Sequence, residues 1–494
     1  MKNYNNLEKK LQQIGHLNTI YGVAHWDKSV SLASGSMQNR AEELASVSAL
    51  IHEMSTSQEM GDLINSAYED KDSLNKWQKK NLELAQKNYD TQTCLPVDLQ
   101  REFNIATSQS EFAWREARQN NNFSKVAPYL EKLFSLTRKK SKILSEKLGL
   151  RPYDALIDQF DPGRRSPEID VVFSGLKEKL IPLAQKIQEK QKSEEVLPLP
   201  NIDVATQRQI SLQIVESMGF DLNCGRLHET LHPFCSGSND DVRLTTSFDE
   251  TRPLFGLFAT IHETGHGLYQ QSLPARYRDQ PVGKPLGMAF HESQSLIMER
   301  QAATSKPFVE FLSRLLQDKF GFKGNAFGFD NLYKLLTRVE SSLIRITSDE
   351  VTYPLHIILR YELEKVILDD NFQINDLPEL WNSKMKEYLG ITPDTDSDGC
   401  MQDIHWYMGA FGYFPAYTNG ALVASMMMQQ IRQKNTNIDN ELVQGSFVGI
   451  NQYLNQNIRS LGSLLNSSEL LEKATGSKII DPQIFIDYLK EKYL

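Results

Sequence analysis

Apolar residues recur every three or four positions through most of the first 200 residues, and this spacing predicts amphipathic helices. We expect helices over residues 7–20, 39–54, 96–118, 128–148 and 169–191. Residues 153–165 are predicted to form a loop, because Asp161, Pro162 and Gly163 make a turn signal. Prolines 198 and 200 then indicate a hinge or a surface connection.

The pattern changes after residue 220. Residues 241–248 alternate in side-chain type as a short strand does, and turn residues precede them at 237–240. Helical spacing returns afterwards, with a polar loop expected at 394–399 and amphipathic helices in the remainder of the chain. The helices predicted in this part span residues 254–270, 288–304, 331–365 and 377–389.

One segment, residues 404–431, contains no Asp, Glu, Lys or Arg and is long enough to span a bilayer. It nevertheless carries His405, Asn419 and several glycines, and polar side chains are costly in hydrocarbon. We therefore favour a buried helix-loop-helix beside an active site over a membrane span.

Composition narrows the function classes. The chain has 494 residues, 40% of them hydrophobic and 24% charged, with a net charge of −9. Such a balance is typical of a globular protein and argues against a nucleic-acid binder or a basic membrane-surface protein. The four cysteines are scattered and the start is too charged for a signal peptide, so we expect a cytoplasmic protein with reduced thiols.

The strongest chemical signal is His262-Glu263-x-x-His266. Positions i and i+4 share one face of a helix, so both imidazoles can reach a single ion. Glu263 stands beside the first ligand, where it can take a proton from water. Chance would produce such a match on the order of once in a hundred chains of this length, so the motif needs further support.

A third ligand is available about thirty residues later, at His291-Glu292. Neighbouring helical positions point roughly 100° apart, so one of the two can bind the metal but hardly both. A site with two histidines and one glutamate would match thermolysin-type zinc peptidases. The alternative is a His-Glu pair at the surface or at the edge of the core. Seven of the ten histidines lie between residues 228 and 405, which marks where the chemistry is expected.

Five sequence motifs stand in order along the chain. They are Asp241-Val-Arg243-Leu-Thr245, His262 to His266, His291-Glu292-Ser293, Ile344-Arg345-x-x-Ser348-Asp349, and Gly399-x-x-Gln402-Asp403-x-His405-Trp406. With these motifs the chain resembles the carboxypeptidase Taq family of metallocarboxypeptidases. The resemblance covers essentially the whole chain and is densest over residues 232–421. Ser348 stands where the family usually has alanine, a change expected to alter packing rather than the reaction.

The resemblance implies a metal ion, one per chain, on His262, His266 and Glu292, with Glu263 as general base. The ion would be Zn²⁺, with Co²⁺ or another divalent ion as alternatives. The implied fold is mainly α, a single large helical structure with a small β-sheet bordering a deep cleft. We expect one domain over residues 1–494, with a helical part to about 200 and a catalytic part from 201, assembled as a homodimer.

Further residues are expected to bind the peptide substrate. An arginine fork suits the free α-carboxylate, and Arg345 and Arg243 are the candidates that match family motifs, with Arg360 third. Surface or helix-pairing roles are the alternatives for each. We expect Asp241, Arg243 and Thr245 to border the cleft and limit how peptides enter it.

The oxyanion of the tetrahedral intermediate needs hydrogen-bond donors beside the metal. His405 is one candidate and Tyr417 the other, with Tyr413 as the less favoured tyrosine. A core aromatic is the alternative for each tyrosine. Asp403 is expected to orient a ligand or His405, and Cys400 to be a small buried residue.

The predicted function is hydrolysis of the C-terminal peptide bond, releasing single amino acids with broad specificity. Two other functions are consistent with the same helical pattern. One is a metallo-oligopeptidase that cuts internally, and the other is a non-catalytic helical scaffold with or without metal. The intact Glu263 argues against the scaffold.

Overall fold

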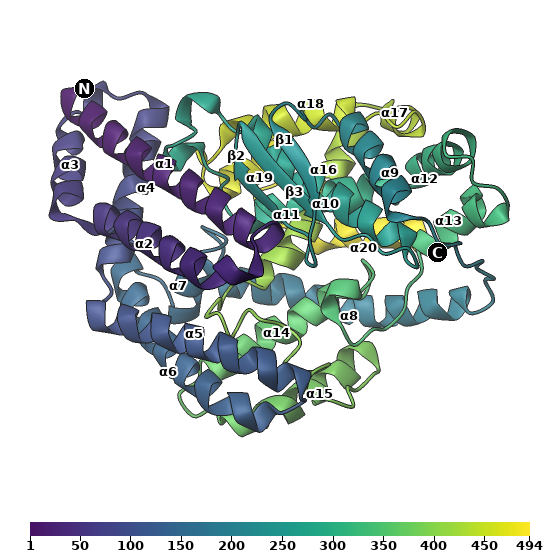
Figure 1. Cartoon of the computed structure of the whole chain (residues 1–494), viewed down its shortest axis with the longest axis horizontal. Coiled ribbons are helices and arrows are strands. Elements are labelled where there is room, and N and C mark those ends of the chain that lie inside the picture. The colour runs from purple at the N-terminus through teal and green to yellow at the C-terminus, as the bar shows by residue number, and fades with distance from the viewer.

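The computed structural model describes all 494 residues, which form helices around one small sheet (Figure 1). The helices of the first half are α1 (Lys2–Val30), α2 (Met37–Thr56), α3 (Gln58–Glu69), α4 (Lys76–Thr93), α5 (Val97–Gln119), α6 (Phe123–Leu148), α7 (Pro152–Ile157), α8 (Ser166–Gln191) and α9 (Val204–Ser217). Those of the second half are α10 (Pro253–Ser272), α11 (Met288–Leu296), α12 (Lys306–Arg314), α13 (Phe329–Leu336), α14 (Tyr353–Ile367), α15 (Leu377–Leu389), α16 (Pro415–Lys434), α17 (Ile438–Val443), α18 (Val448–Asn457), α19 (Ser467–Thr475) and α20 (Pro482–Tyr493).

The predicted mainly helical fold with a small sheet is confirmed. Helices α1, α2, α5, α6 and α8 contain the five helical segments expected in the first half, apart from Pro96, which stands just before α5. Helix α6 begins five residues before its predicted start, because the Asn122 side chain accepts a hydrogen bond of 3.1 Å from the backbone N–H of Lys125 and caps the first turn. Gly149, with φ of +66°, ends the helix.

The sheet has three strands, β1 (Gly225–Glu229), β2 (Cys235–Ser238) and β3 (Asp241–Thr246). Strand β3 lies in the centre, parallel to β1 and antiparallel to β2. The predicted strand at 241–248 is therefore confirmed, whereas β1 and β2 were not anticipated. Helix α10 packs on β2 and β3, and β2 also contacts α1.

Two predicted segments were wrong. Residues 153–165 are not all loop, since α7 spans Pro152–Ile157. Pro152 suits the first helical turn, and Asp154 accepts a hydrogen bond of 2.6 Å from the backbone N–H of Ser166. The single helix expected at 331–365 is two helices, α13 and α14, separated by irregular backbone at 337–352. There the Asp349 side chain accepts hydrogen bonds from the backbone N–H groups of Val351 and Thr352, in the turn that precedes α14.

The uncharged segment at 404–431 is buried, but it is not a helix-loop-helix. Its first eleven residues, 404–414, form irregular turns, and α16 then runs without interruption from Pro415 to Lys434. No helix of the protein has both the length and the apolar character needed to cross a membrane.

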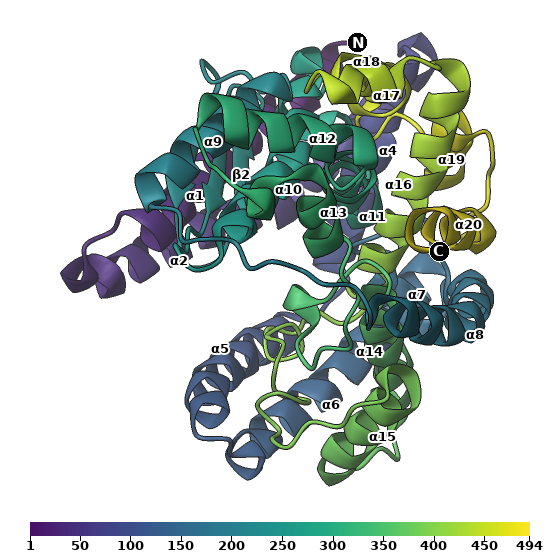
Figure 2. The ribbon, with the colours of Figure 1, turned by 90° about the vertical axis from the view of Figure 1, so that its right-hand side faces the viewer.

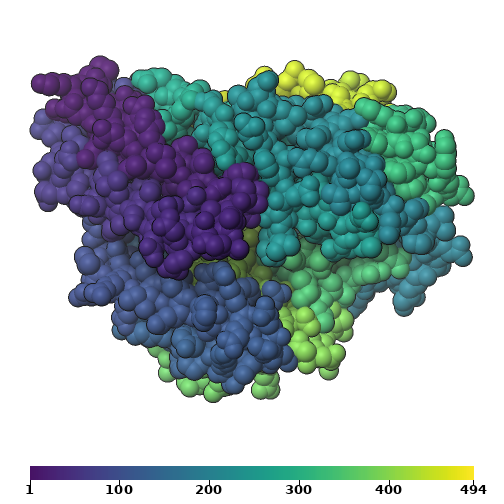
Figure 3. Space-filling view, viewed as in Figure 1, coloured from purple at the N-terminus to yellow at the C-terminus, as the bar shows by residue number.

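The helices form an upper and a lower part in the view of Figure 2. The upper part contains α1, α9 and α10, and the lower part contains α5, α6, α14 and α15. The connection after α8 runs from the lower part up to α9, as Figure 2 shows, which agrees with the expected surface connection near residue 200. Figure 3 shows the surface hollowed between the two parts, with the yellow-green of later residues visible at depth.

Candidate active site

Three candidate metal ligands meet at the junction of α10 and α11. His262 and His266 lie one turn apart on α10, and Glu292 comes from α11. The Nε2 atom of each histidine lies 3.7 Å from Oε2 of Glu292, and the three ligand atoms all lie within 4.8 Å of one another. Two imidazoles and one carboxylate at this spacing fit a divalent ion and leave a coordination position for substrate or water.

Glycines allow the helices that carry these ligands to approach closely. A Cβ atom on Gly265, next to His266, would lie 2.4 Å from the backbone oxygen of Gln294 on α11. A Cβ on Gly420 of α16 would lie 2.7 Å from Cβ of Glu292. Any larger residue would therefore force α10 or α16 away from α11.

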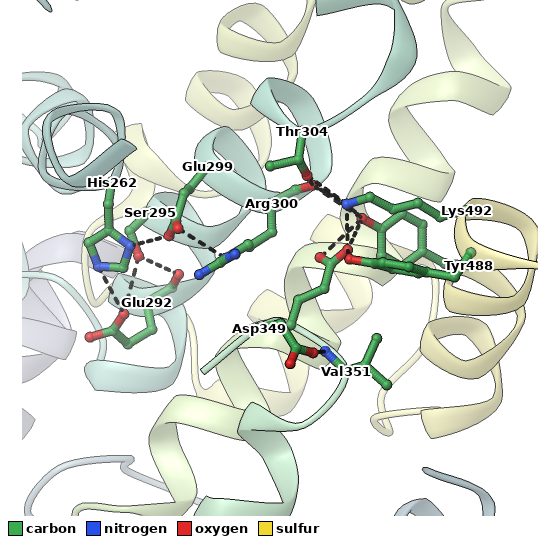
Figure 4. A network of polar contacts seen from close by, with 12 residues as sticks. His262, Glu292, Ser295, Glu299, Arg300, Thr304, Asp349, Val351, Tyr488 and Lys492 are labelled. Atoms are coloured by element: carbon green, nitrogen blue, oxygen red, sulfur yellow. Dashed lines mark hydrogen bonds and ion pairs between the residues drawn. The ribbon is translucent and has the colours of Figure 1, made fainter. Parts of the chain in front are cut away.

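Each histidine is oriented through its other ring nitrogen. His262 Nδ1 lies 2.8 Å from Oε2 of Glu299, and His266 Nδ1 lies 2.6 Å from Nδ1 of His291. Figure 4 shows His262 between the carboxylates of Glu292 and Glu299. These contacts direct both Nε2 atoms toward Glu292. Burial disfavours the charge on His262, but the hydrogen bond to Glu299 and the charges of Glu299, Glu263 and Glu292 together outweigh it and raise the pKa of His262 to about 9.

Glu263, the expected general base, is only 7% exposed. Burial raises its pKa to about 7, with Glu292 and Glu299 adding to the effect and His262 opposing it. A carboxyl group with a pKa near neutrality can both accept and return a proton during turnover.

A second cluster of charges is centred on Asp403. Arg345, from the irregular segment before α14, donates from Nε and Nη2 to one carboxylate oxygen at 3.0 and 2.9 Å, and from Nη1 to the Tyr353 hydroxyl at 2.8 Å. Despite burial, Arg345 and Arg360 hold the pKa of Asp403 far below its ordinary value. Arg345 also lies close enough to Glu292 to oppose the rise in that residue's pKa.

Arg360 lies deeper than Arg345 and is fully buried. Its three nitrogens donate to Asp403, to the backbone oxygen of His356 and to the Gln402 side chain, at 2.5, 2.7 and 2.8 Å. Each nitrogen of this guanidinium is thus already engaged by the protein itself.

His405 and the expected oxyanion tyrosines are brought together. His405 Nε2 lies 3.3 Å from the Tyr417 hydroxyl, and the rings of Tyr413 and Tyr417 are 5.2 Å apart. Burial raises the pKa of both tyrosines, and the nearby carboxylate of Glu292 contributes to the rise. His405 Nδ1 is 3.9 Å from Asp403, beyond hydrogen-bonding distance, so Asp403 mainly serves the two arginines.

The residues of the strand motif lie at the junction of the sheet and α1. Arg243 forms a bidentate pair with Asp241 and stacks on Trp26 of α1, 4.5 Å from the ring centre. Thr245 is fully buried, and its hydroxyl donates to the backbone oxygen of Phe234 at 2.9 Å. Cys400 is buried, as expected of a small core residue.

Two residues at the site were missed in the sequence. Glu299 follows Glu292 by seven positions, which in a continuous α-helix would place both on one face, so a position near the ligands was open to prediction. The π-helical turn that begins at Ile297 was not. Tyr353, which holds Arg345, had no comparable signal because it is brought there by the irregular segment at 337–352.

A helix bearing His-Glu-x-x-His, joined by a glutamate from a second helix within a mostly helical fold, defines a metallopeptidase. The chain belongs to the Carboxypeptidase Taq (M32) metallopeptidase family, whose model matches residues 6–493. It is thus a metallocarboxypeptidase by family, and its substrates are peptides.

Individual relatives agree with this assignment. Carboxypeptidase 1 of Bacillus subtilis is 35% identical over 485 residues, covering 98% of this chain and 96% of the relative. Thermostable carboxypeptidase 1 of Pyrococcus furiosus is 31% identical over 490 residues, covering 98% and 97%. Among solved structures, metallocarboxypeptidase 1 of Trypanosoma cruzi superposes with a TM-score of 0.97 at 33% identity, covering 100% of this chain and 99% of the other.

Proposed function

We propose that this chain is a zinc-dependent carboxypeptidase that releases single residues from the C-termini of peptides with broad specificity. The observation that carries the proposal is the meeting of His262, His266 and Glu292 beside a buried Glu263. Co²⁺ or another divalent ion would suit the same three donors.

A bound zinc ion would supply a Lewis acid that polarises the scissile carbonyl and makes water acidic near neutral pH. Glu263 takes the proton from the attacking water and later delivers it to the leaving amine. Its pKa near 7 suits both transfers, because the carboxylate binds and releases a proton at little cost at this pH.

His405 and Tyr417 donate hydrogen bonds to the oxyanion that develops at the carbonyl. Their contact at 3.3 Å places the two groups side by side before the substrate arrives, and the oxyanion would replace this contact as the acceptor for the group that donates in it. Tyr413 is the alternative donor, since its ring packs against Tyr417.

Arg345 binds the α-carboxylate of the substrate. Its guanidinium has N–H groups that neither Asp403 nor Tyr353 accepts from. It also lies near enough to Glu292 for its charge to oppose the rise in the pKa of that carboxyl group. Arg360 is a weaker candidate because it is fully buried and each of its three nitrogens already donates to the protein. Arg243 is also weaker, because it pairs with Asp241 and stacks on Trp26 where the sheet meets α1.

Asp241, Arg243 and Thr245 limit the entry of peptides by fixing where α1 meets the sheet. The stacking of Arg243 on Trp26 supports this role, because α1 then holds a set position at the sheet edge. The family resemblance also supports a homodimer, which the molar mass in solution would test.

The deciding experiment is mass spectrometry of peptide digests. Peptides with a free C-terminus should lose one residue at a time, whereas matched C-terminally amidated peptides should remain intact. Internal fragments from the amidated peptides would instead indicate the oligopeptidase alternative.

Metal analysis and chelation test the mechanism. The purified protein should contain about one zinc ion per chain, lose activity with chelator and regain it with added zinc. The Glu263→Gln variant should keep the metal and lose turnover by at least a hundredfold. Full activity in excess chelator, or in this variant, would reject the mechanism.

A further inference from the structure

A buried polar cluster joins α20 to the segment that follows α11. Lys492 of α20 forms an ion pair with Glu350, and the side chains are only 7% and 5% exposed. The hydroxyl of Tyr493 donates to the same carboxylate at 2.8 Å. A buried lysine and glutamate are retained at a cost in desolvation, which only good geometry and further hydrogen bonds offset.

Two side chains of the cluster donate hydrogen bonds to one backbone carbonyl, that of Arg300. Lys492 Nζ lies 3.3 Å from this oxygen and 2.5 Å from the Thr304 hydroxyl, which itself donates to Arg300 at 2.6 Å. The Tyr488 hydroxyl lies 3.1 Å from the same oxygen. Helix α20 thus adds Lys492 and Tyr488 to the donor that Thr304 already provides for this carbonyl near a helix end.

Arg300 lies within an unusual π-helical segment, Ile297–Ala303, that continues α11. Such segments are rare and occur frequently at functional sites. Here the segment directs Glu299 at the candidate metal ligand: Glu299 Oε2 lies 2.8 Å from His262 Nδ1, and Arg300 Nε lies 2.9 Å from Glu299 Oε1. Figure 4 shows the contacts running from Lys492 through Arg300 and Glu299 to His262.

We propose that Lys492, Tyr488 and Glu350 position His262 through Arg300 and Glu299, so that α20 sets the affinity of the site for its metal ion. The inference rests on the proposed metal site. Glu299 and Lys492 are positioning residues, because neither supplies a ligand atom to the proposed metal ion. Loss of the α20 contacts lets the π-helical segment relax and turns Glu299 away from His262.

The test is zinc affinity of the full chain, measured by competition with a chromophoric chelator. Glu299→Gln should weaken zinc binding about 10- to 100-fold, as loss of a residue that orients a ligand does. Lys492→Met, which keeps most of the side chain's packing, should weaken it about 3- to 10-fold, a size typical of indirect coupling. Lys490→Met is the matched control on the same helix; Lys490 is 53% exposed, and its variant should bind as the parent does.

The double variant Glu299→Gln/Lys492→Met separates coupling from general damage. If α20 acts through Glu299, the double variant binds zinc no more weakly than Glu299→Gln alone. Additive losses, or parental affinity in Lys492→Met, would overturn the inference. Because Lys492→Met leaves Glu350 unpaired, Tyr488→Phe serves as a milder second variant, and Lys492→Arg should restore affinity.

A spectroscopic readout distinguishes positioning from structural loss. The visible absorption of the cobalt-loaded protein should change in Lys492→Met and Tyr488→Phe, and it should stay parental in Lys490→Met. An unchanged spectrum in both α20 variants would also overturn the inference. Failure of the proposed function gives a different result: His262→Ala would then bind zinc as tightly as the parent, or the parent would bind none.

Discussion

The Nδ1 atoms of His266 and His291 lie 2.6 Å apart. One ring must donate and the other accept, and His266 needs its Nε2 lone pair for a metal ion, so His266 is the donor. Burial lowers the pKa of His291 to about 4, which keeps this ring neutral and able to accept at neutral pH. His291 therefore orients a ligand, although its neighbour Glu292 is the candidate ligand itself.

Replacing His291 should weaken metal binding. His291→Leu removes the acceptor and should lower zinc affinity about 10- to 100-fold, whereas His291→Gln retains an acceptor and should lose less. Competition with a chelator measures both variants. Equal affinity in His291→Leu and the parent would show that the contact has no orienting role.

Gly265→Ala should destabilise the junction of α10 and α11. The added methyl group would lie 2.4 Å from the Gln294 backbone oxygen, and we expect a loss of about 1–3 kcal/mol with weaker metal binding. Gly175→Ala in α8 is the control, because a Cβ there meets nothing within 4 Å. This variant should raise the free energy of unfolding by about 0.5–1 kcal/mol. Thermal denaturation with and without zinc checks both; a neutral Gly265→Ala would contradict the tight approach.

Arg345→Gln should act on the free carboxylate of the substrate. We expect kcat/KM to fall about 10- to 100-fold for peptides with a free C-terminus, equivalent to a charge-assisted hydrogen bond of about 1.5–3 kcal/mol. The ratio of kcat/KM for peptides with a free C-terminus to kcat/KM for amidated peptides should fall by the same factor. Arg338→Gln, which loses the pair with Glu340 and a hydrogen bond to the backbone oxygen of Gln191, both away from Asp403, is the control. An unchanged preference would assign carboxylate binding to another residue.

Tyr417→Phe should lower kcat with little change in KM, because the oxyanion donor acts only in the transition state. The expected loss is about a hundred- to a thousandfold. Tyr413→Phe is the comparison, since the two rings pack 5.2 Å apart. A larger loss of kcat in Tyr413→Phe than in Tyr417→Phe would show that Tyr413 is the oxyanion donor.

Glu364 should make stability depend on pH. It is fully buried, and burial raises its pKa to about 7 although Tyr153 and Trp406 donate hydrogen bonds to it. Between pH 4.5 and 7 the unfolded chain releases this proton and the folded chain keeps it, so stability falls as pH rises, by about 3 kcal/mol. Glu364→Gln should lose this decline; parallel curves of melting temperature against pH for the two proteins would contradict it.

Several elements of this fold were predictable from local pattern. The helix bearing His262 and His266 and the strand at Asp241–Thr246 were expected, and the structure has both. The failures at 331–365 and 404–431 share one cause: residues 337–352 and 404–414 are held in irregular backbone by contacts with distant residues. Arg345 N–H, for example, donates to Gln402, 57 positions away. Periodicity reports only neighbours within a few turns and carries no information about such contacts.

The sequence by itself determined the helical class, the i, i+4 pair on α10 and the residue types suited to a metal and a proton transfer. Only the tertiary structure decided which side chains meet. It placed Glu292 beside the two imidazoles, and it placed Glu299 and His291 at the Nδ1 atoms of His262 and His266. It also buried Arg360 among its own partners and left Arg345 near Glu292. The physical reason is that these contacts depend on how closely helices pack, and glycines such as Gly265 set that distance only once a partner helix is in place.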